Sequence, residues 1–405
     1  MPAKLTVSIM DVLFSTVFMM LIGILFLDLV PLQEPMTCAN YTDHDACPET
    51  YFAMTYQDAR EKFLAAAAQA NAEVDHALVL TVGNVQYYMD TAFIRGSRRE
   101  HLLVHASGTH GVEGFTGSAI QNKILRDWNA TSGPSVLFVH GINPYGMAHN
   151  RRANENNVDL NRNYLTAAEW QEVLQRDPNS TEYSALQHFF TPQKAPRFID
   201  RYLFFVTAVP QLVKHGYAAL KRALVTGQYH HAEGVSYGGD KEQRSIALLR
   251  EILTRHSSGV SKAVFVDVHT GLGKYGKDTI MTSSAEEAAW AAEIFNHTTV
   301  QDHNTATAGP SSGYSLAKGI IRPCGDITET CLAVTEEFGT VNPLFVARAT
   351  VLENQAYHTC RGSYVHAVMG TWFRDAFYPQ ELSYKQAVLK GGRDTFHRAF
   401  QYLSS

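Results

Sequence analysis

The segment HASGTHGVEGFTGSAIQ carries a histidine and a glutamate at a spacing that suits a metal ion. His110 and Glu113 stand three residues apart, just after a short apolar run and among glycines. Residues three apart on one helical turn point to the same side, so an imidazole nitrogen and a carboxylate oxygen can reach one ion. The pair alone is a weak signal, because a surface histidine near a glutamate has the same pattern. A metal site needs a third ligand.

A second apolar run supplies a candidate for that ligand. In AVFVDVHTGLG, His269 ends a stretch that has the pattern of a buried strand, and open α/β sheets bind ligands at the carboxyl ends of their strands. Two histidines and a glutamate leave a fourth tetrahedral position for water, which is typical of catalytic zinc. Asp267 could orient the site or be an ordinary carboxylate at a strand end.

A third apolar run ends in TEEFGT and brings two acids to the same predicted sheet edge. Side chains alternate along a strand, so Glu336 and Glu337 point to opposite faces and one of them can face the metal. That residue is the candidate general base, which takes a proton from a water whose pKa the metal lowers. We favour Glu337, with Glu336 as the alternative.

The polar segment INPYGMAHNRRANENNVDLNRNY follows the apolar run SVLFVHG and is rich in asparagine and arginine. The amide of Asn161 and the planar fork of Arg162 suit a carboxylate. Arg151 or Arg152 could stabilise an oxyanion. A surface loop held by salt bridges would have the same composition.

Several buried strands must position these residues. Apolar runs bounded by turn residues predict strands at residues 76–83, 101–108, 135–141, 263–270, 278–284 and 331–339. Helical patterns cover residues 51–74, 118–128, 244–256 and 285–295. This alternation predicts a three-layer α/β fold with a mixed, mostly parallel sheet. Residues 167–229 are helical in pattern and interrupted by prolines, which predicts an insertion or cap that shapes access to the site.

The order of these motifs resembles that of the zinc carboxypeptidase superfamily, which includes carboxypeptidase A-like enzymes and their succinylglutamate desuccinylase and aspartoacylase relatives. The resemblance rests on HGVEGFTGSAIQ, NPYGMAHNRRANENNVDLNRNY, DVHTGLG and EEFGT, and extends from about residue 80 to about residue 353. The chain looks closest to a branch of that superfamily described only as a domain of unknown function. The resemblance implies the α/β/α phosphorylase/hydrolase-like zinc exopeptidase fold, with a catalytic domain at residues 50–405 and the helical insertion within it.

Carried over residue by residue, the resemblance also implies the metal and the base. One zinc ion would be bound by His110, Glu113 and His269. Glu337 would be the catalytic base.

The resemblance implies substrate contacts as well. Asn161 and Arg162 would hold a substrate carboxylate, and Arg152 would polarise the scissile carbonyl. Arg151 could replace Arg152, because the spacing before the D-L-N-R motif varies in the superfamily. Tyr314 lies where carboxypeptidases carry a mobile tyrosine, although its flanking residues match poorly and an ordinary packed tyrosine fits better.

These residues together predict a zinc-dependent metallohydrolase that cleaves an amide bond next to a free carboxylate. A peptide C-terminus and a small N-acyl amino acid both satisfy the motifs. The alternatives are an N-acyl amino acid deacylase of the aspartoacylase type and a catalytically inactive zinc-binding protein.

Composition excludes several other classes of protein. The chain has 405 residues, 45% of them hydrophobic and 18% charged, so it can bury a large core. Its net charge is -5 and it has no long run of lysine or arginine, which argues against nucleic-acid binding. GLGKYG matches a dinucleotide motif but precedes a strand-like run instead of a helix, so no dinucleotide site is expected.

The N-terminal 35 residues predict entry into the secretory pathway. Lys4 precedes a nearly unbroken apolar run from Val12 to Leu27, which is typical of a signal peptide or a signal anchor. The anchor is slightly favoured, so a membrane tether is expected with the catalytic domain outside the cytosol.

Sequons and cysteines agree with export of the chain. Four N-x-S/T sequons begin at Asn40, Asn129, Asn179 and Asn296, so a glycoprotein is expected. Two close cysteine pairs are candidates for disulfides, Cys38 with Cys47 and Cys324 with Cys331. Spacing alone does not settle either pairing.

Overall fold

The computed structural model describes residues 47–303 and 313–405, together with Ser15, Met19 and Cys38. Apart from Ser15 and Met19, the predicted leader at residues 1–35 lies outside the described residues, as does the sequon at Asn40. In the described part of the chain, no helix has both the length and the apolar character needed to span a membrane.

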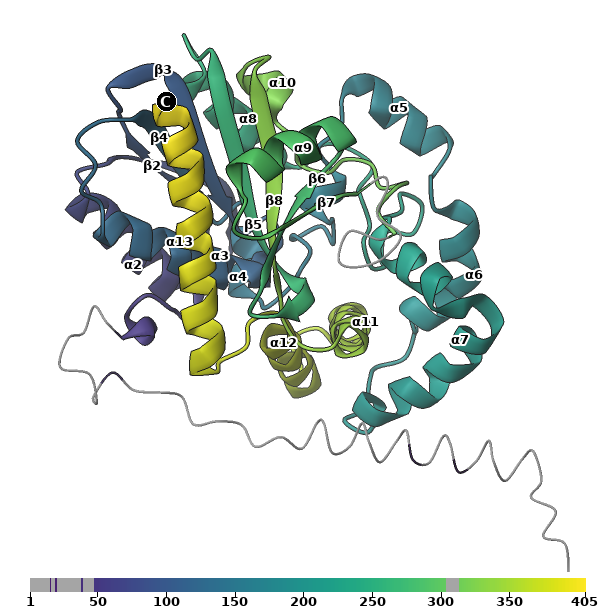
Figure 1. The fold of residues 1–405 in the computed structure, drawn as a ribbon. Coiled ribbons are helices and arrows are strands. Elements are labelled where there is room, and N and C mark those ends of the chain that lie inside the picture. The colour runs from purple at the N-terminus through teal and green to yellow at the C-terminus, as the bar shows by residue number, and fades with distance from the viewer. Residues whose placement is uncertain (1–14, 16–18, 20–37, 39–46, 304–312) are drawn as a thin grey trace, which may run out of the picture.

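A single eight-stranded sheet forms the centre of the described structure (Figure 1). Its strands lie in the order β1-β2-β4-β3-β5-β8-β6-β7. β4, β3, β5 and β8 are parallel neighbours, and β6 is parallel to β7, while β1 with β2, β2 with β4 and β6 with β8 pair antiparallel. The strands are β1 (Glu73–Val82), β2 (Val85–Ile94), β3 (Arg98–Ser107), β4 (Pro134–His140), β5 (Lys262–Tyr275), β6 (Asp278–Thr282), β7 (Thr299–Asp302) and β8 (Cys331–Gly339). The predicted mixed, mostly parallel sheet is confirmed.

The burial of the strands explains which of them could be predicted from the sequence. Every residue of β4 and β8 is buried, and strands covered on both faces have nearly continuous apolar sequences. The predicted strands missed β2 and β7. β2 mixes aromatic and polar residues, and β7 has only four residues, so neither forms a clear apolar run.

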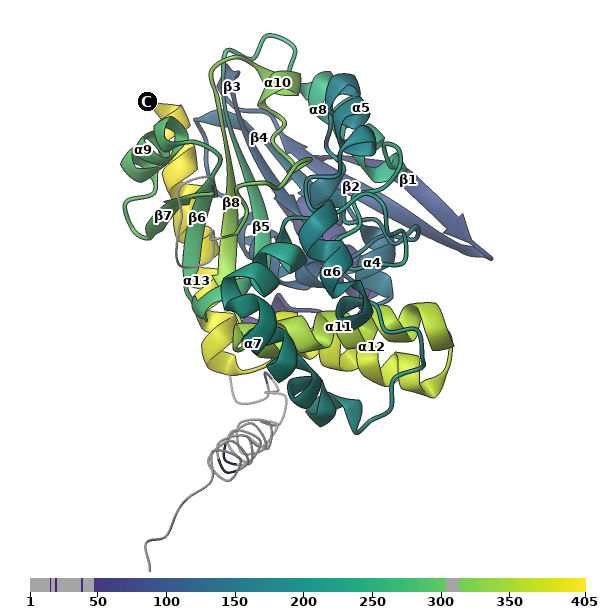
Figure 2. The ribbon, with the colours of Figure 1, turned by 90° about the vertical axis from the view of Figure 1, so that its right-hand side faces the viewer.

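Helices cover both faces of the sheet and complete three layers, as Figures 1 and 2 show from two sides. One face carries α2 (Tyr56–Gln69), α3 (Gly114–Arg126), α9 (Ala285–Ile294) and α13 (Leu382–Ser404). The other face carries α8 (Arg244–His256) and the short α10 (Cys324–Ile327). The helix predicted over residues 51–74 is shorter. It begins at Tyr56, where the side chain of Thr55 caps it by accepting from the N–H of Asp58, and it ends before β1 begins at Glu73.

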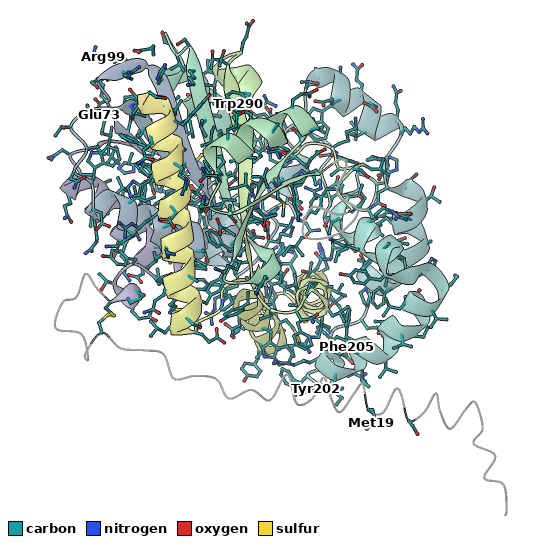
Figure 3. The ribbon with its side chains drawn as sticks, in the orientation of Figure 1. Met19, Glu73, Arg99, Tyr202, Phe205 and Trp290 are labelled. Atoms are coloured by element: carbon teal, nitrogen blue, oxygen red, sulfur yellow. A yellow bond between two sulfur atoms is a disulfide. The ribbon has the colours of Figure 1, made fainter. Side chains whose placement is uncertain are left out.

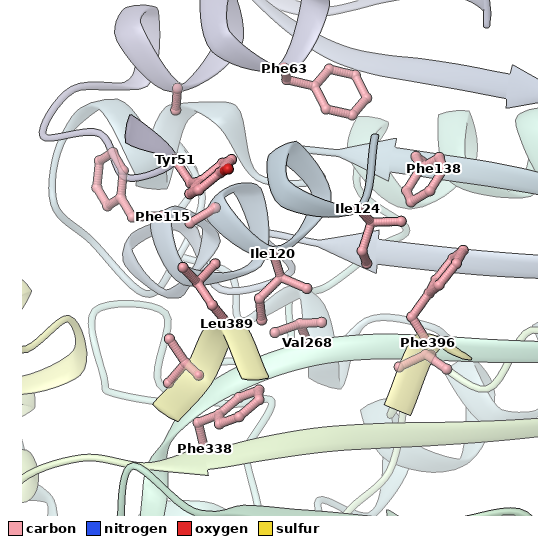
Figure 4. Close-up of a cluster of buried hydrophobic side chains, with 14 of the residues drawn as sticks. Tyr51, Phe63, Phe115, Ile120, Ile124, Phe138, Val268, Phe338, Leu389 and Phe396 are labelled. Atoms are coloured by element: carbon pink, nitrogen blue, oxygen red, sulfur yellow. The ribbon is translucent and has the colours of Figure 1, made fainter. Parts of the chain in front are cut away.

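The larger core lies between the sheet and the first helical layer (Figure 4). Ile120 and Ile124 of α3 lie there near Val268 of β5, and Phe396 of α13 stacks on Phe138 of β4 with ring centres 5.7 Å apart. All five side chains are at least 96% buried, so this core holds the parallel strands in place beneath the site.

The predicted helical insertion contains three helices, α5 (Ala167–Gln175), α6 (Ser180–Phe190) and α7 (Asp200–Val225). α7 continues through Pro210 and bends at Gly216, whose φ of 77° lies in the left-handed region. α11 (Pro343–Cys360) begins just after β8 and is followed by α12 (Tyr364–Phe377). In Figure 2, α7 and α11 lie side by side below the sheet, and Phe205 of α7 contacts Phe345 of α11 with ring centres 5.8 Å apart.

Short helices and two disulfides complete the described structure. The short helices are η3 (Pro48–Thr50), η4 (Gly111–Glu113), α4 (Pro144–Ala148) and η5 (Leu160–Arg162). Cys38 is bonded to Cys47, and Cys324 of α10 is bonded to Cys331 at the start of β8. Both close cysteine pairs of the sequence are therefore disulfides.

Candidate active site

Three neighbouring parallel strands, β3, β5 and β8, end at the candidate site. His110 follows the end of β3, and Glu337 lies two residues before the end of β8. His269 lies inside β5, which is longer than the apolar run predicted and continues for six residues to Tyr275. His269 and Glu337 are direct partners in the register of these two strands. Because paired residues of adjacent strands point to the same face, both side chains face one cavity, which they line.

A tight corner after β3 places His110 and Glu113. Gly108 has a φ of 77°, which glycine adopts without strain. A Cβ atom at Gly111 would lie 2.1 Å from the main-chain carbon of Gly146, so the close approach of η4 to α4 excludes any side chain there. The glycines around the H-x-x-E pair therefore make the corner possible.

The three predicted metal ligands converge. His110 Nδ1 lies 3.0 Å from Glu113 Oε1, His269 Nδ1 lies 3.3 Å from Glu113 Oε2, and the two Nδ1 atoms are 3.1 Å apart. All three side chains are no more than 3% exposed. Nitrogen and oxygen donors at these separations fit around one ion with bonds of about 2.0–2.2 Å. The triad could therefore hold a metal ion.

A carboxylate holds each imidazole from the side opposite Glu113. His110 Nε2 donates to Asp159 Oδ1 at 3.0 Å, and His269 Nε2 donates to Asp267 Oδ2 at 2.8 Å. Metal-binding histidines usually donate their second N–H in this way, which leaves the other nitrogen free to bind the ion. Asp267 was an open prediction of the sequence. Asp159 was missed, although it stands two residues before Asn161 in the same polar motif.

The charges of the triad stabilise one another. Burial alone would raise the pKa of Glu113, but the charges and hydrogen bonds of His110 and His269 bring it below its ordinary value. Burial lowers the pKa of His269, and the stronger combined effect of Asp267 and Glu113 raises it to about 10. The N–H of Thr270 also donates to Glu113 Oε2 at 2.9 Å.

Of the two acids in TEEFGT, Glu337 faces the cavity. The N–H of Leu272 donates to its Oε1 at 2.8 Å. Burial and the charge of Glu113 raise the pKa of Glu337 to about 7. Glu336 is fully buried on the opposite face, where burial and the charge of Asp278 raise its pKa well above the ordinary range. The predicted alternation of the two acids is present, and the role of Glu337 as base stays a prediction.

The two adjacent arginines point in different directions. Arg152 lines the cavity, and its Nη1 and Nε donate to Glu113 and Asp159, each at 3.1 Å. Arg151 donates from Nε to Glu353 at 2.7 Å, and its guanidinium lies 3.2 Å from the ring centre of Tyr357. Only Arg152 therefore reaches the metal ligands.

The position of Arg151 predicts a structural effect. Arg151→Met leaves the buried carboxylate of Glu353 without its cation, so we expect the free energy of unfolding to fall by roughly 3–5 kcal/mol. Urea unfolding would measure it. The double variant Arg151→Met, Glu353→Gln is the control and should recover much of the loss. Wild-type stability with lost activity in Arg151→Met would instead place Arg151 in the site.

Asn161 and Tyr314 also line the cavity. The N–H of Ile321 donates to Asn161 Oδ1 at 2.8 Å, which leaves the amide N–H₂ for another partner. The ring of Tyr314 stacks on His303 with centres 5.2 Å apart. Burial raises the pKa of Tyr314 to about 12. Both residues therefore lie at the cavity, and their contacts with a substrate stay predictions.

Arg162 lies behind Asn161 and is not among the residues that line the cavity. It is fully buried, and its Nε donates to the main-chain carbonyl of Thr226 at 3.0 Å. Its other nitrogens donate to the carbonyls of Asn161 and Val225. The contact of Arg162 with a substrate carboxylate stays a prediction.

The cavity at the triad extends beneath the insertion and has a volume of about 1220 Å³, including the part open to solvent. Lys221 of α7 lines it, and burial lowers the pKa of this lysine against the opposing charge of Glu337. Much of the remaining wall is apolar and comes from α6, α7 and α11. The sequence analysis did not identify Lys221 or this wall. The only signal was apolar residues at helical spacing, which any packed helix shows.

Comparison with known proteins gives one family match and several structural ones. A family model described as "Protein of unknown function (DUF2817)" matches residues 52–391. No curated protein matches the sequence significantly.

Several solved structures match the chain at low sequence identity. Carboxypeptidase A from Helicoverpa armigera is 11% identical, with 89% of this chain and 82% of that chain covered and a TM-score of 0.48. Bovine thrombin-activatable fibrinolysis inhibitor, solved with a tick carboxypeptidase inhibitor, is 10% identical, with 88% and 98% covered and a TM-score of 0.46. An aspartoacylase family protein from Mesorhizobium loti is 12% identical, with 71% and 66% covered and a TM-score of 0.33. Both groups named by the motif resemblance occur among these matches, but at such identities and TM-scores the likeness assigns no activity.

Proposed function

The chain belongs to the DUF2817 family, whose description names no activity, and we propose that it is a metal-dependent hydrolase that cleaves an amide bond next to a free carboxylate. One observation carries this proposal. His110, Glu113 and His269 converge in a cavity, with Glu337 on the strand next to His269. This arrangement combines a metal site with a nearby acid that can move a proton.

We propose zinc as the ion. Two imidazole nitrogens and one carboxylate oxygen are common donors of catalytic zinc, and three protein ligands leave a position open. When bound, zinc supplies Lewis acidity, which lowers the pKa of water to about 7 and polarises a carbonyl group.

The side chains around the triad then have distinct tasks. Glu337 takes a proton from the attacking water and passes it to the leaving amine, while the N–H of Leu272 holds its Oε1 in place. Arg152 Nη2, which has no hydrogen-bond partner among the described residues, donates to the carbonyl oxygen as that oxygen gains negative charge. Asn161 binds the free carboxylate, and Tyr314 packs beside it. Arg162 joins this contact only if its guanidinium leaves the carbonyls of Val225 and Thr226.

A deacylase of N-acyl amino acids is the second candidate. The observation that favours it is the cover over the site, since α7 and α11 line the same cavity as the triad. A covered cavity suits a small substrate better than an extended polypeptide.

A substrate panel tests the proposal. The zinc-loaded protein is incubated with peptides that have a free C-terminus and with N-acyl amino acids, and the released amine is measured. Release from peptides identifies a carboxypeptidase, and release from N-acyl amino acids identifies a deacylase. Bound zinc without release from any substrate would contradict the hydrolase and favour a binding protein.

We also propose that the protein enters the secretory pathway, where it is secreted or anchored to a membrane. The two disulfides support this location, because disulfides persist in oxidising compartments. Whether the leader is cleaved or retained as an anchor stays a prediction, since it lies outside the described residues.

The sequons give this location a specific test. The side chains of Asn129 and Asn296 are exposed, whereas Asn179 is 4% exposed and its Nδ2 donates to the carbonyl of Ala223 at 2.9 Å. We therefore expect glycans at Asn129 and Asn296 and none at Asn179 when the chain is expressed through a glycosylating secretory pathway. Mass spectrometry of glycopeptides would measure this. Glycosylation at Asn179 would show that sugar is added before the insertion folds.

A further inference from the structure

The cavity has a polar end and an apolar end. At the polar end, Arg152 is hydrogen-bonded to Glu113, and the charge of Lys221 interacts with that of Glu337. The apolar end lies between the helical insertion and α11, where Phe190 of α6 and Leu344 and Ala347 of α11 line it. A ligand that fills both ends must therefore be amphipathic, with its polar group at the triad.

α7 provides a continuous apolar wall. Phe204, Ala208 and Leu212 line the cavity at intervals of four residues, which places them on one face of the helix. After the bend at Gly216, Leu220 and Leu224 continue the wall. In each of the two stretches, the lining residues lie along one side of the helix. The first stretch, from Phe204 to Leu212, is about 12 Å long at a rise of 1.5 Å per residue. Figure 3 labels Phe205 where α7 approaches α11, which forms the facing wall.

The length of the apolar wall distinguishes between two kinds of apolar group. From Phe204 to Leu212 the wall extends about 12 Å along α7, which is longer than one amino-acid side chain. One amino-acid side chain would leave much of this wall in contact with water. A long hydrocarbon chain can follow the wall along α7 and bury apolar surface at every methylene.

We propose that the substrate is an N-acyl amino acid with a long unbranched acyl chain, which lies between α7 and α11 while the amino-acid carboxylate lies at the polar end. This inference rests on the proposed function and names its substrate class. The reaction adds one water across the amide bond: the C–N bond breaks, hydroxyl joins the acyl carbon, and the nitrogen receives a proton. The products are a fatty acid and a free amino acid.

A chain-length series tests the inference. The substrates are N-acetylglycine, N-hexanoylglycine and N-dodecanoylglycine, each kept below its micelle-forming concentration, with acetyl-Leu-Leu-Gly as a peptide of comparable apolar size. We expect kcat/KM for the dodecanoyl substrate to exceed that for the acetyl substrate by at least about 100-fold, because each buried methylene contributes to binding. The dodecanoyl substrate should also exceed the peptide.

Bulky substitutions in the wall should remove this preference. Ala208→Trp on α7 and Ala347→Trp on α11 fill the cavity from opposite sides. In each we expect at least a tenfold loss of kcat/KM for N-dodecanoylglycine and little change for N-acetylglycine. Val213→Trp is the matched control, because Val213 lies on the same helix, is 82% exposed and should leave the preference unchanged. Retained activity on N-acetylglycine shows that a variant is folded.

Binding gives a measurement that does not depend on turnover. Titration calorimetry of the zinc-loaded Glu337→Gln variant with N-dodecanoylglycine should show binding, and Ala208→Trp in that background should weaken it at least tenfold. Equal kcat/KM across the series, or a peptide cleaved better than the dodecanoyl substrate, would overturn the inference and leave the hydrolase standing. Binding of N-dodecanoylglycine without hydrolysis of any substrate would support the cavity's role and overturn the proposed function.

Discussion

Glu337→Gln should lower kcat by about 10²–10⁴-fold while the protein keeps its metal, because glutamine preserves the shape of the side chain but cannot accept a proton. Glu337 faces the cavity beside His269, and its Oε1 accepts a hydrogen bond from the N–H of Leu272. An amide oxygen can accept the same bond, so the local structure should persist. Kinetics on the best substrate of the panel and metal analysis of the same sample would measure both effects.

The neighbouring acid provides the control for this prediction. Glu336→Gln changes the same type of side chain one residue away, on the opposite face of β8. Burial raises the pKa of the Glu336 carboxyl well above its ordinary value, which favours the neutral form, so an amide of similar size should alter kcat little. If Glu336→Gln removed turnover and Glu337→Gln did not, the general base would be Glu336.

The second large effect that we expect is the loss of zinc binding when one metal ligand is removed. The wild-type protein should bind one zinc ion per chain, and His269→Ala should abolish stoichiometric binding, because only two of the three converging donors remain. Competition with a chromophoric chelator would measure the affinity. Zinc at 100 times its Kd should also stabilise the wild-type fold by about 2.7 kcal/mol, visible as a raised Tm, and should leave the Tm of His269→Ala unchanged.

Two further variants separate a metal site from a merely buried histidine cluster. Asp267→Asn and Asp159→Asn remove the carboxylates that accept from the two imidazoles, so each should weaken zinc affinity by about 10–100-fold. His303→Asn is the control, because His303 lines the same cavity but does not belong to the triad. Zinc affinity that is unchanged in His269→Ala and in both aspartate variants would show that the metal binds elsewhere.

The predicted site residues that the structure brings together share a local cause. His110 and Glu113 converge because three residues and a glycine-bounded corner bring their side chains to one side. Glu337 and Glu336 separate because alternation along β8 sends successive side chains to opposite faces. The apolar runs also marked the buried parallel strands, whose carboxyl ends meet at one edge of the sheet.

The sequence left open the roles and partners that depend on how distant segments pack. Arg151 and Arg152 are neighbours with the same side chain, and their opposite directions follow from Glu353, 202 residues after Arg151, and from Glu113. The acidic partner of His110 comes from a loop 49 residues later. No local period encodes these contacts.

The sequence by itself therefore determined the donor types, their order and the strands that carry them, because side-chain direction repeats with a fixed period along a helix turn or a strand. Only the tertiary structure decided which arginine reaches the ligands, where Arg162 lies and how large a cavity α7 and α11 enclose. Those outcomes depend on the close packing of segments far apart in the chain, where the available volume and the nearest charge select one orientation of each side chain.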